Sequence, residues 1–98
     1  MKVLLRQSAV DDLDRIFAWI AKDNASAAAD MISRIRDRIS LLELESLAHM
    51  GRPGLVAGTR ELIEYPYIIV YRVDDRQHEI VVLAVLHGGA RSATVIGA

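Results

Sequence analysis

Four residues in the C-terminal half have side chains that could together act on a phosphodiester: Arg60, Arg72, His87 and Arg91. A metal-free ribonuclease needs a base for the 2′-hydroxyl, cations for the phosphate and an acid for the leaving 5′-oxygen. His87 could act as base or acid because histidine exchanges protons near neutral pH. Any of the three arginines could hold the scissile phosphate through paired hydrogen bonds. The residue types therefore permit a nuclease site without requiring one.

These residues also have a purely structural interpretation. Arg72 could extend its stem over apolar neighbours and pair with Glu61, Glu64 or a C-terminal carboxylate. A histidine at the end of a strand and before two glycines, such as His87, more often stabilises a turn than catalyses a reaction. The residue types alone favour this structural interpretation over catalysis.

Other chemistries find little support in the sequence. The three histidines are scattered, without the ligand spacing of a metal site on a helix or strand, and the chain has no cysteine. The glycine-containing turns at 51–54 and 87–90 lack the spacing of a phosphate-binding loop. No serine lies in the turn that an activated nucleophile would need. We therefore expect no metal site and no cofactor.

The N-terminal half predicts a short strand followed by two helices. Residues 2–6 suit a strand, and Ser8 is expected to cap the first helix with Asp11 completing a variant of the capping box. Residues 22–24 break the pattern, and Asn24 is expected to cap the second helix. Arg34 and Arg38 are expected on the solvated surface of that helix. The short break predicts an antiparallel helical hairpin.

Apolar stripes define the faces that these helices should bury. In the first helix Trp19 lies outside the stripe, and in the second the apolar residues form one narrow seam. The stripe of the first helix consists of Leu13, Ile16, Phe17 and Ile20, and the seam of the second consists of Ala28, Ile32, Ile35, Ile39 and Leu42.

The C-terminal half predicts a loop at 48–58 and then three strands at about 59–64, 67–73 and 78–87, with Pro66 at the first bend. In the middle strand, alternation places Tyr67 and Tyr71 on one face and Arg72 on the other. The element order predicts an α+β domain in which the helical hairpin packs on an antiparallel β-sheet. The N-terminal strand is expected at the edge of that sheet. We expect one domain, 1–98, with its core at about 2–91 and a tail at 92–98.

Composition limits the class of protein. The chain has 98 residues, of which 52% are hydrophobic, and its formal net charge is −1. Nucleic-acid binders usually carry a basic excess, because phosphate contacts supply most non-specific affinity. The sequence shows neither a signal-peptide core nor a membrane span. We therefore expect a soluble, cytoplasmic protein without a membrane partner.

Four segments occur in a distinctive order: "SAVDDLDRIFAWIAKDNASAAADMISRI", "MGRPG", "TRELIEYPYIIVYRV" and "IVVLAVLHGGAR". In this order and at this spacing they resemble the RelE/ParE superfamily of type II toxins, the toxic halves of bacterial toxin–antitoxin operons. The resemblance runs from about Leu5 to Arg91. It implies an N-terminal strand, a helical hairpin and an antiparallel sheet, which agrees with the fold predicted above.

The resemblance implies a cognate antitoxin as partner and leaves two activities open. The motifs and the near-neutral charge are closer to the ParE-like branch, whose members inhibit DNA gyrase. The alternatives are a RelE-like mRNA interferase, for which Arg60, Arg72, His87 and Arg91 would be the catalytic candidates, and an inactive member. We expect the chain to associate with nucleic acid only indirectly, through the antitoxin or through the target. Because exposed aromatic residues are favoured at interfaces, we expect Trp19, Tyr65 and Tyr67 to contact the antitoxin.

Overall fold

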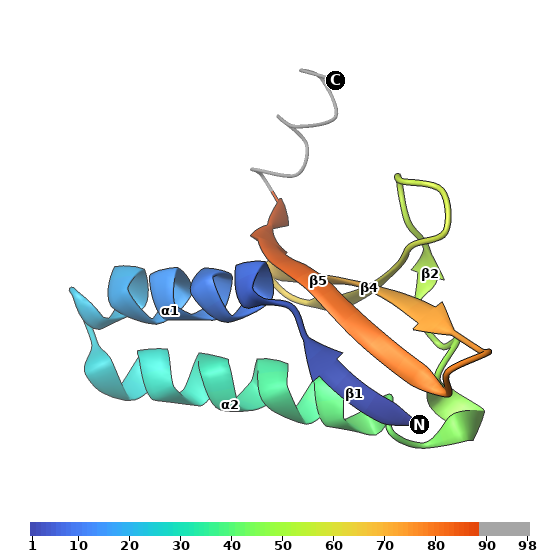
Figure 1. Ribbon diagram of the computed structural model, residues 1–98. Helices are drawn as coiled ribbons and strands as arrows, with labels where there is room; N and C mark the ends of the chain where they lie inside the picture. Colours follow the sequence, from blue (N-terminus) through green and yellow to red (C-terminus); the bar gives the residue numbers. More distant parts are fainter. Residues whose placement is uncertain (89–98) are drawn as a thin grey trace.

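The computed structural model describes residues 1–88 and shows two layers, a helical hairpin and a five-stranded sheet in the order β1-β5-β4-β3-β2 (Figure 1). The predicted α+β fold is confirmed. The predicted tail at 92–98 and Arg91 lie outside the described residues. The elements are β1 (Lys2–Leu5), α1 (Gln7–Ala21), α2 (Ala25–Leu41), a 3₁₀ turn (Glu45–Leu47), β2 (Arg52–Pro53), β3 (Arg60–Glu64), β4 (Tyr67–Asp74) and β5 (Glu79–His87).

Strand β1 lies at the edge of the sheet, as predicted, but its direction makes the sheet mixed. It pairs in parallel with β5, with Lys2 opposite Glu79 and Leu5 opposite Val82, whereas the other pairs are antiparallel. Tight turns force antiparallel pairing within the meander β3-β4-β5. The long connection between β1 and β5 imposes no such direction, because a crossover of this length also permits a parallel pair.

The two helices begin in different ways. Asn24 caps α2, and its side-chain oxygen accepts a hydrogen bond from the Ala27 N–H at 2.9 Å, as predicted. The predicted cap of α1 is wrong, because the helix begins at Gln7 and the capping position belongs to Arg6, whose side chain makes no capping bond. Ser8 instead lies inside the first turn, where its hydroxyl is used for a contact with the sheet.

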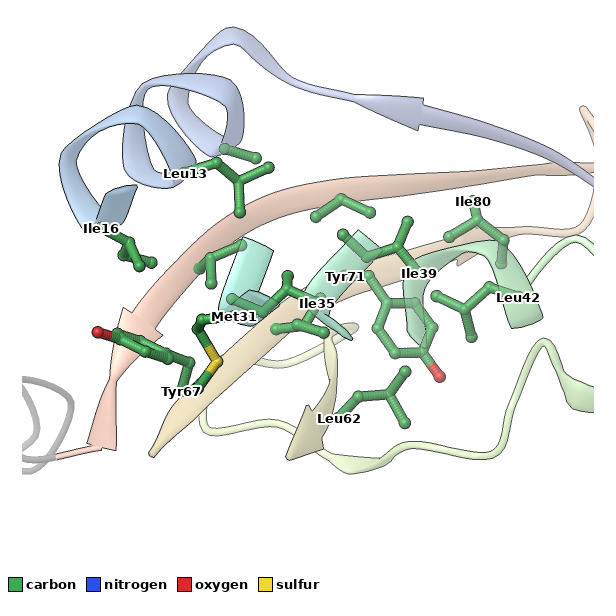
Figure 2. Packing of buried hydrophobic residues seen from close by; sticks show 14 of the residues in the cluster. Leu13, Ile16, Met31, Ile35, Ile39, Leu42, Leu62, Tyr67, Tyr71 and Ile80 are labelled. Carbon is green, nitrogen blue, oxygen red and sulfur yellow. The ribbon is translucent and has the colours of Figure 1, made fainter. Parts of the chain in front are cut away.

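The core lies between the hairpin and one face of the sheet (Figure 2). The seam of α2 is confirmed, with Ile35 and Leu42 fully buried and Ile32 partly buried against the cluster. Phe17 departs from the predicted stripe of α1, because 42% of its surface is exposed. Tyr71 lies on the same face of β4 as Tyr67, as alternation predicts, and this helix-facing side buries it fully.

The predicted loop at 48–58 contains a two-residue strand, β2, that pairs with β3. The hydroxyl of Tyr71 donates to the Ala48 carbonyl at 3.0 Å and accepts from the Gly51 N–H at 3.0 Å. A Cβ atom at position 51 would lie 2.8 Å from this hydroxyl and 2.8 Å from the Glu61 carbonyl oxygen, so the close approach requires glycine. Tyr71 therefore holds the loop against the sheet.

Candidate functional site

The sheet register separates the residues that were the candidates for a nuclease site. On β3, Arg60 lies opposite Tyr71, whereas His87 lies opposite Tyr67, four residues away along β4. Four residues of a strand span roughly 13 Å. Arg72 alternates with Tyr71 and therefore points to the helix-free face of the sheet. These three side chains do not converge on one point, and Arg91 lies outside the described residues.

The His87 side chain is held at the end of β5. Its ring meets the ring of Tyr67 edge-on, with centroids 5.6 Å apart and an angle of 87° between the planes. The next residue is also fixed, because the Gly88 N–H donates to the Pro66 carbonyl at 2.9 Å. An edge-on contact of this kind orients an imidazole by packing. His87 is exposed, but neither Arg60 nor Arg72 lies beside it in the sheet register.

The acidic residues suggested as partners of Arg72 pair with other arginines. Glu61, only 3% exposed, accepts from Arg52 Nε at 3.3 Å and from the Leu55 N–H at 3.4 Å. Glu64 lies 3.6 Å from Arg38 Nε, and an Arg38 Nη donates to the Ile63 carbonyl at 3.0 Å. Within residues 1–88 the suggested pairing of Arg72 with Glu61 or Glu64 is therefore wrong.

Arg38 was expected on the solvated surface of α2, and its side chain is partly exposed there, but its contact with β3 was not predicted. Its guanidinium bonds to β3 and so ties α2 to the sheet. The ion pair of the buried Glu61 was not predicted, because nothing in the sequence indicates that the segment containing Arg52 pairs with the strand containing Glu61. Pairing of β2 with β3 places these two residues directly opposite each other. Long-range pairs of this kind depend on register, which local sequence patterns do not determine.

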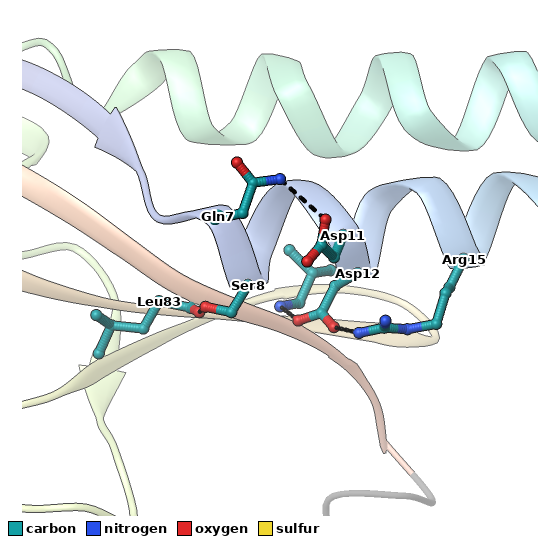
Figure 3. Close-up of polar contacts among 7 residues, drawn as sticks. Gln7, Ser8, Asp11, Asp12, Arg15 and Leu83 are labelled. Atoms are coloured by element: carbon teal, nitrogen blue, oxygen red, sulfur yellow. Dashed lines mark hydrogen bonds and ion pairs between the residues drawn. The ribbon is translucent and has the colours of Figure 1, made fainter.

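A polar clamp fixes α1 on an irregular part of β5 (Figure 3). The register between β4 and β5 shifts between Val70 and Tyr71, whose partners are Ala84 and Val82, so Leu83 has no residue opposite it. The Ser8 hydroxyl donates to the Leu83 carbonyl at 2.7 Å, and the Val85 N–H donates to an Asp12 carboxylate oxygen at 2.9 Å.

This clamp satisfies backbone groups at the irregularity and sets where α1 runs over β5. Asp12 also pairs with Arg15 one turn further along the helix. From this anchored end, the helical hairpin extends past the end of the sheet (Figure 1). The exposed faces of the hairpin are thereby presented on a rigid support. The clamp was not predicted, because Ser8 and Asp12 resemble ordinary residues of a helix N-terminus.

The predicted antitoxin contacts differ in exposure. Trp19 is 69% exposed in the last turn of α1, and the Lys22 ammonium lies 5.0 Å from the centre of its ring. Tyr65 is 83% exposed at the bend between β3 and β4. Tyr67 is only 6% exposed, so the expectation that it lies on the surface is wrong. Its position on the helix-facing side of β4 packs it in the core instead (Figure 2).

Metal and membrane sites are not indicated within the described part of the chain. Residues 1–88 contain no cluster of three or more histidine, cysteine, aspartate or glutamate side chains that could hold a metal ion. Over the same residues, neither helix combines the length and the apolar character needed to cross a bilayer.

Known proteins share both the sequence pattern and the fold of this chain. A model of the family described as "ParE toxin of type II toxin-antitoxin system, parDE" matches residues 3–91. The chain belongs to this family. Its relatives include a protein named "Putative toxin Y4kP" from Sinorhizobium fredii, which is 39% identical over 77 residues covering 76% of this chain and 75% of the relative.

Solved structures of toxin–antitoxin systems share the fold. The chromosomal ParDE system of P. aeruginosa matches with a TM-score of 0.75 and 24% identity, covering 89% of this chain and 95% of the other. The RelBE2 complex of Mycobacterium tuberculosis matches with a TM-score of 0.63 and 24% identity, covering 88% and 95%. At this identity the two structures support the fold of the ParE family member and leave its target open.

Proposed function

We propose that this ParE family toxin inhibits DNA gyrase by binding it and is neutralised by a cognate antitoxin. The observation that carries the proposal is the separation of Arg60, Arg72 and His87 in the sheet register. General acid–base cleavage of RNA requires the acid or base and the phosphate-binding cations to reach the same phosphodiester at once. An inhibitor that acts by binding requires no such convergence.

The charge of the chain supports the same proposal. A ribosome-dependent nuclease must dock into a dense field of RNA phosphate, where a surface with net charge −1 is a handicap. Buried and half-buried acidic groups offset part of the arginine content, as Glu61 does for Arg52 and Glu64 for Arg38. The proposal implies a cytoplasmic protein, because its target would be there.

The antitoxin surface is proposed to include the projecting part of the hairpin. Trp19 and Tyr65 are large, exposed aromatic side chains, the type that contributes most to protein interfaces. Phe17 on α1 adds a further partly exposed ring. An amphipathic segment of the antitoxin would cover these side chains, and repression of the operon through DNA would belong to the antitoxin.

The decisive experiment places the purified toxin with gyrase and supercoiled plasmid, beside programmed ribosomes carrying mRNA. In the gyrase reaction we expect less supercoiling or an accumulation of cleaved plasmid trapped on gyrase. In the ribosome reaction we expect the mRNA to remain intact. The antitoxin-bound complex serves as control and should be inactive in both reactions. Cleaved mRNA with unaffected gyrase would establish the RelE-like alternative, and no effect in either reaction would indicate an inactive member.

The variant His87→Ala separates the two mechanisms within the same experiment. Inhibition by binding should retain most of its strength, because no proton transfer is involved. Loss of a general acid or base would instead lower an RNA cleavage rate by roughly 10²- to 10⁴-fold. A variant that keeps its fold but loses gyrase inhibition would therefore contradict the proposal.

A further inference from the structure

A cavity of about 300 Å³ lies beside the beginning of β3, and none of the exposed aromatic residues of the hairpin lines it. Its walls come from the loop before β2, from β2, from the loop between β2 and β3, from the start of β3, and from β4. The lining residues are His49, Pro53, Gly58, Thr59, Arg60 and Val73. Arg60 is the cation of this cavity that carries a charge at every physiological pH.

The charge of Arg60 is not neutralised within the described chain. Its Nε is shielded from solvent and has no hydrogen-bond partner, and Arg60 forms no ion pair within residues 1–88. The adjacent Glu61 points to the opposite face of β3 and pairs with Arg52. A partly desolvated guanidinium without a counter-charge is costly, and an anion bound to its Nη groups would relieve that cost, although the shielded Nε itself lies out of reach of such an anion.

The walls of the cavity are fixed before any ligand binds. In the loop between β2 and β3, Thr59 Oγ1 donates to the Val56 carbonyl at 2.6 Å and the Gly54 N–H donates to the Thr59 carbonyl at 2.8 Å. On the other side, the Tyr71 hydroxyl fixes the backbone on both sides of His49 through Ala48 and Gly51. A preformed site loses less conformational entropy on binding.

We propose that this cavity accepts the carboxylate of an aspartate or glutamate side chain of the antitoxin. One guanidinium matches one carboxylate and can bind it through two parallel hydrogen bonds. Pro53 and Val73 offer apolar contacts for the methylene groups of such a side chain. This inference rests on the proposed antitoxin partner and names a contact on it that is separate from the aromatic surface.

A nucleic-acid phosphate suits the cavity less well. The His49 imidazole lies 4.0 Å from the Asp75 carboxylate, so a negative charge stands next to the cavity wall. A phosphodiester chain brings many charges past this carboxylate, and each repels it, whereas a single acidic side chain brings one.

The first test measures affinity between the full-length chain and the antitoxin that co-purifies from its operon. Arg60→Gln should weaken binding about 10- to 100-fold, because hydrogen bonds to charged groups are among the stronger polar contacts. The affinity of Arg60→Lys should lie between those of the wild type and Arg60→Gln, since lysine keeps the positive charge but lacks the planar guanidinium that binds a carboxylate through two hydrogen bonds. The matched control is Arg76→Gln, which removes the same charge from an exposed turn and should bind like wild type.

Stability of the free chain provides a second readout. Because Arg60 has no internal partner, the urea midpoint of Arg60→Gln should equal or exceed that of the wild type. A lower midpoint contradicts the proposal, because it would mean that the chain itself satisfies the charge. Equal antitoxin affinity of Arg60→Gln and wild type also overturns the proposal, although the proposed function would stand.

The third measurement does not depend on the antitoxin. Sodium acetate and sodium phosphate are titrated into the isotope-labelled chain while the Arg60 Nε–H and His49 ring signals are followed by NMR. Acetate should shift both signals saturably, and Arg60→Gln should abolish the His49 response. A stronger response to phosphate, or none to either anion, overturns the proposal. If the wild type binds no antitoxin, the proposed function fails, and the antitoxin contact inferred from it fails too.

Discussion

Replacing Tyr71 by phenylalanine isolates one buried hydroxyl, because the ring keeps its volume and its packing. Tyr71 is fully buried in the core, with 0% of its surface exposed to solvent. Its hydroxyl forms hydrogen bonds with the backbone of Ala48 and Gly51. Both backbone partners are buried, so Tyr71→Phe leaves a carbonyl and an N–H without a partner. Each unsatisfied buried group costs about 1–3 kcal/mol, and local relaxation recovers part of it. We expect a loss of about 2–4 kcal/mol in the free energy of unfolding.

Urea denaturation measures this loss directly as a shift of the midpoint at constant slope. In a domain of this size each kcal/mol lowers the melting temperature by about 4–8 °C, so calorimetry should detect a shift above about 8 °C. Tyr65→Phe is the matched control, because Tyr65 is 83% exposed, and its midpoint should not change. A loss below about 0.5 kcal/mol for Tyr71→Phe would refute the reasoning that the hydroxyl holds the loop on the sheet.

Three further substitutions test other contacts. Asn24→Ala removes the cap of α2 and should lower the free energy of unfolding by about 1 kcal/mol in urea, whereas Asn24→Asp should retain it. Asp12→Ala removes the acceptor of the Val85 N–H and should cost about 1–3 kcal/mol in the same assay, whereas Asp12→Asn keeps an acceptor oxygen and should cost less. Trp19→Ala should weaken antitoxin binding by roughly tenfold or more in calorimetric titration while leaving the urea midpoint unchanged, since this ring is 69% exposed.

Local patterns predicted the elements that depend on local physics. The seam of α2 follows from apolar spacing, and Asn24 caps the helix because its side chain needs only the next turn. The alternation in β4 correctly placed Tyr67 and Tyr71 on the same face, and the structure shows that this face is the one in the core. The predicted exposure of Tyr67 rested on its closeness to the bend, and it is wrong because alternation does not by itself tell which face of a strand is buried.

Contacts that depend on register were not predictable from the sequence. Ser8 has the residue type of a helix cap, but the irregularity at Leu83 provides a carbonyl that accepts its hydroxyl instead. Arg38 fits a solvated helix surface until β3 comes within reach of its guanidinium. For the candidate site, the residue types of Arg60 and His87 permitted catalysis without favouring it, and only the strand pairing revealed their separation.

Two adjacent residues of β3 illustrate how a neutral chain can still present a specific charge. Glu61 is buried on one face of the strand and is compensated by Arg52 and by a backbone N–H. Arg60 points to the other face, where its Nε has no hydrogen-bond partner. Evolution toward stability alone would pair or remove such an arginine, since an uncompensated guanidinium lowers the stability of the free chain. This difference is expected if Glu61 stabilises the fold and Arg60 binds a carboxylate of a partner protein.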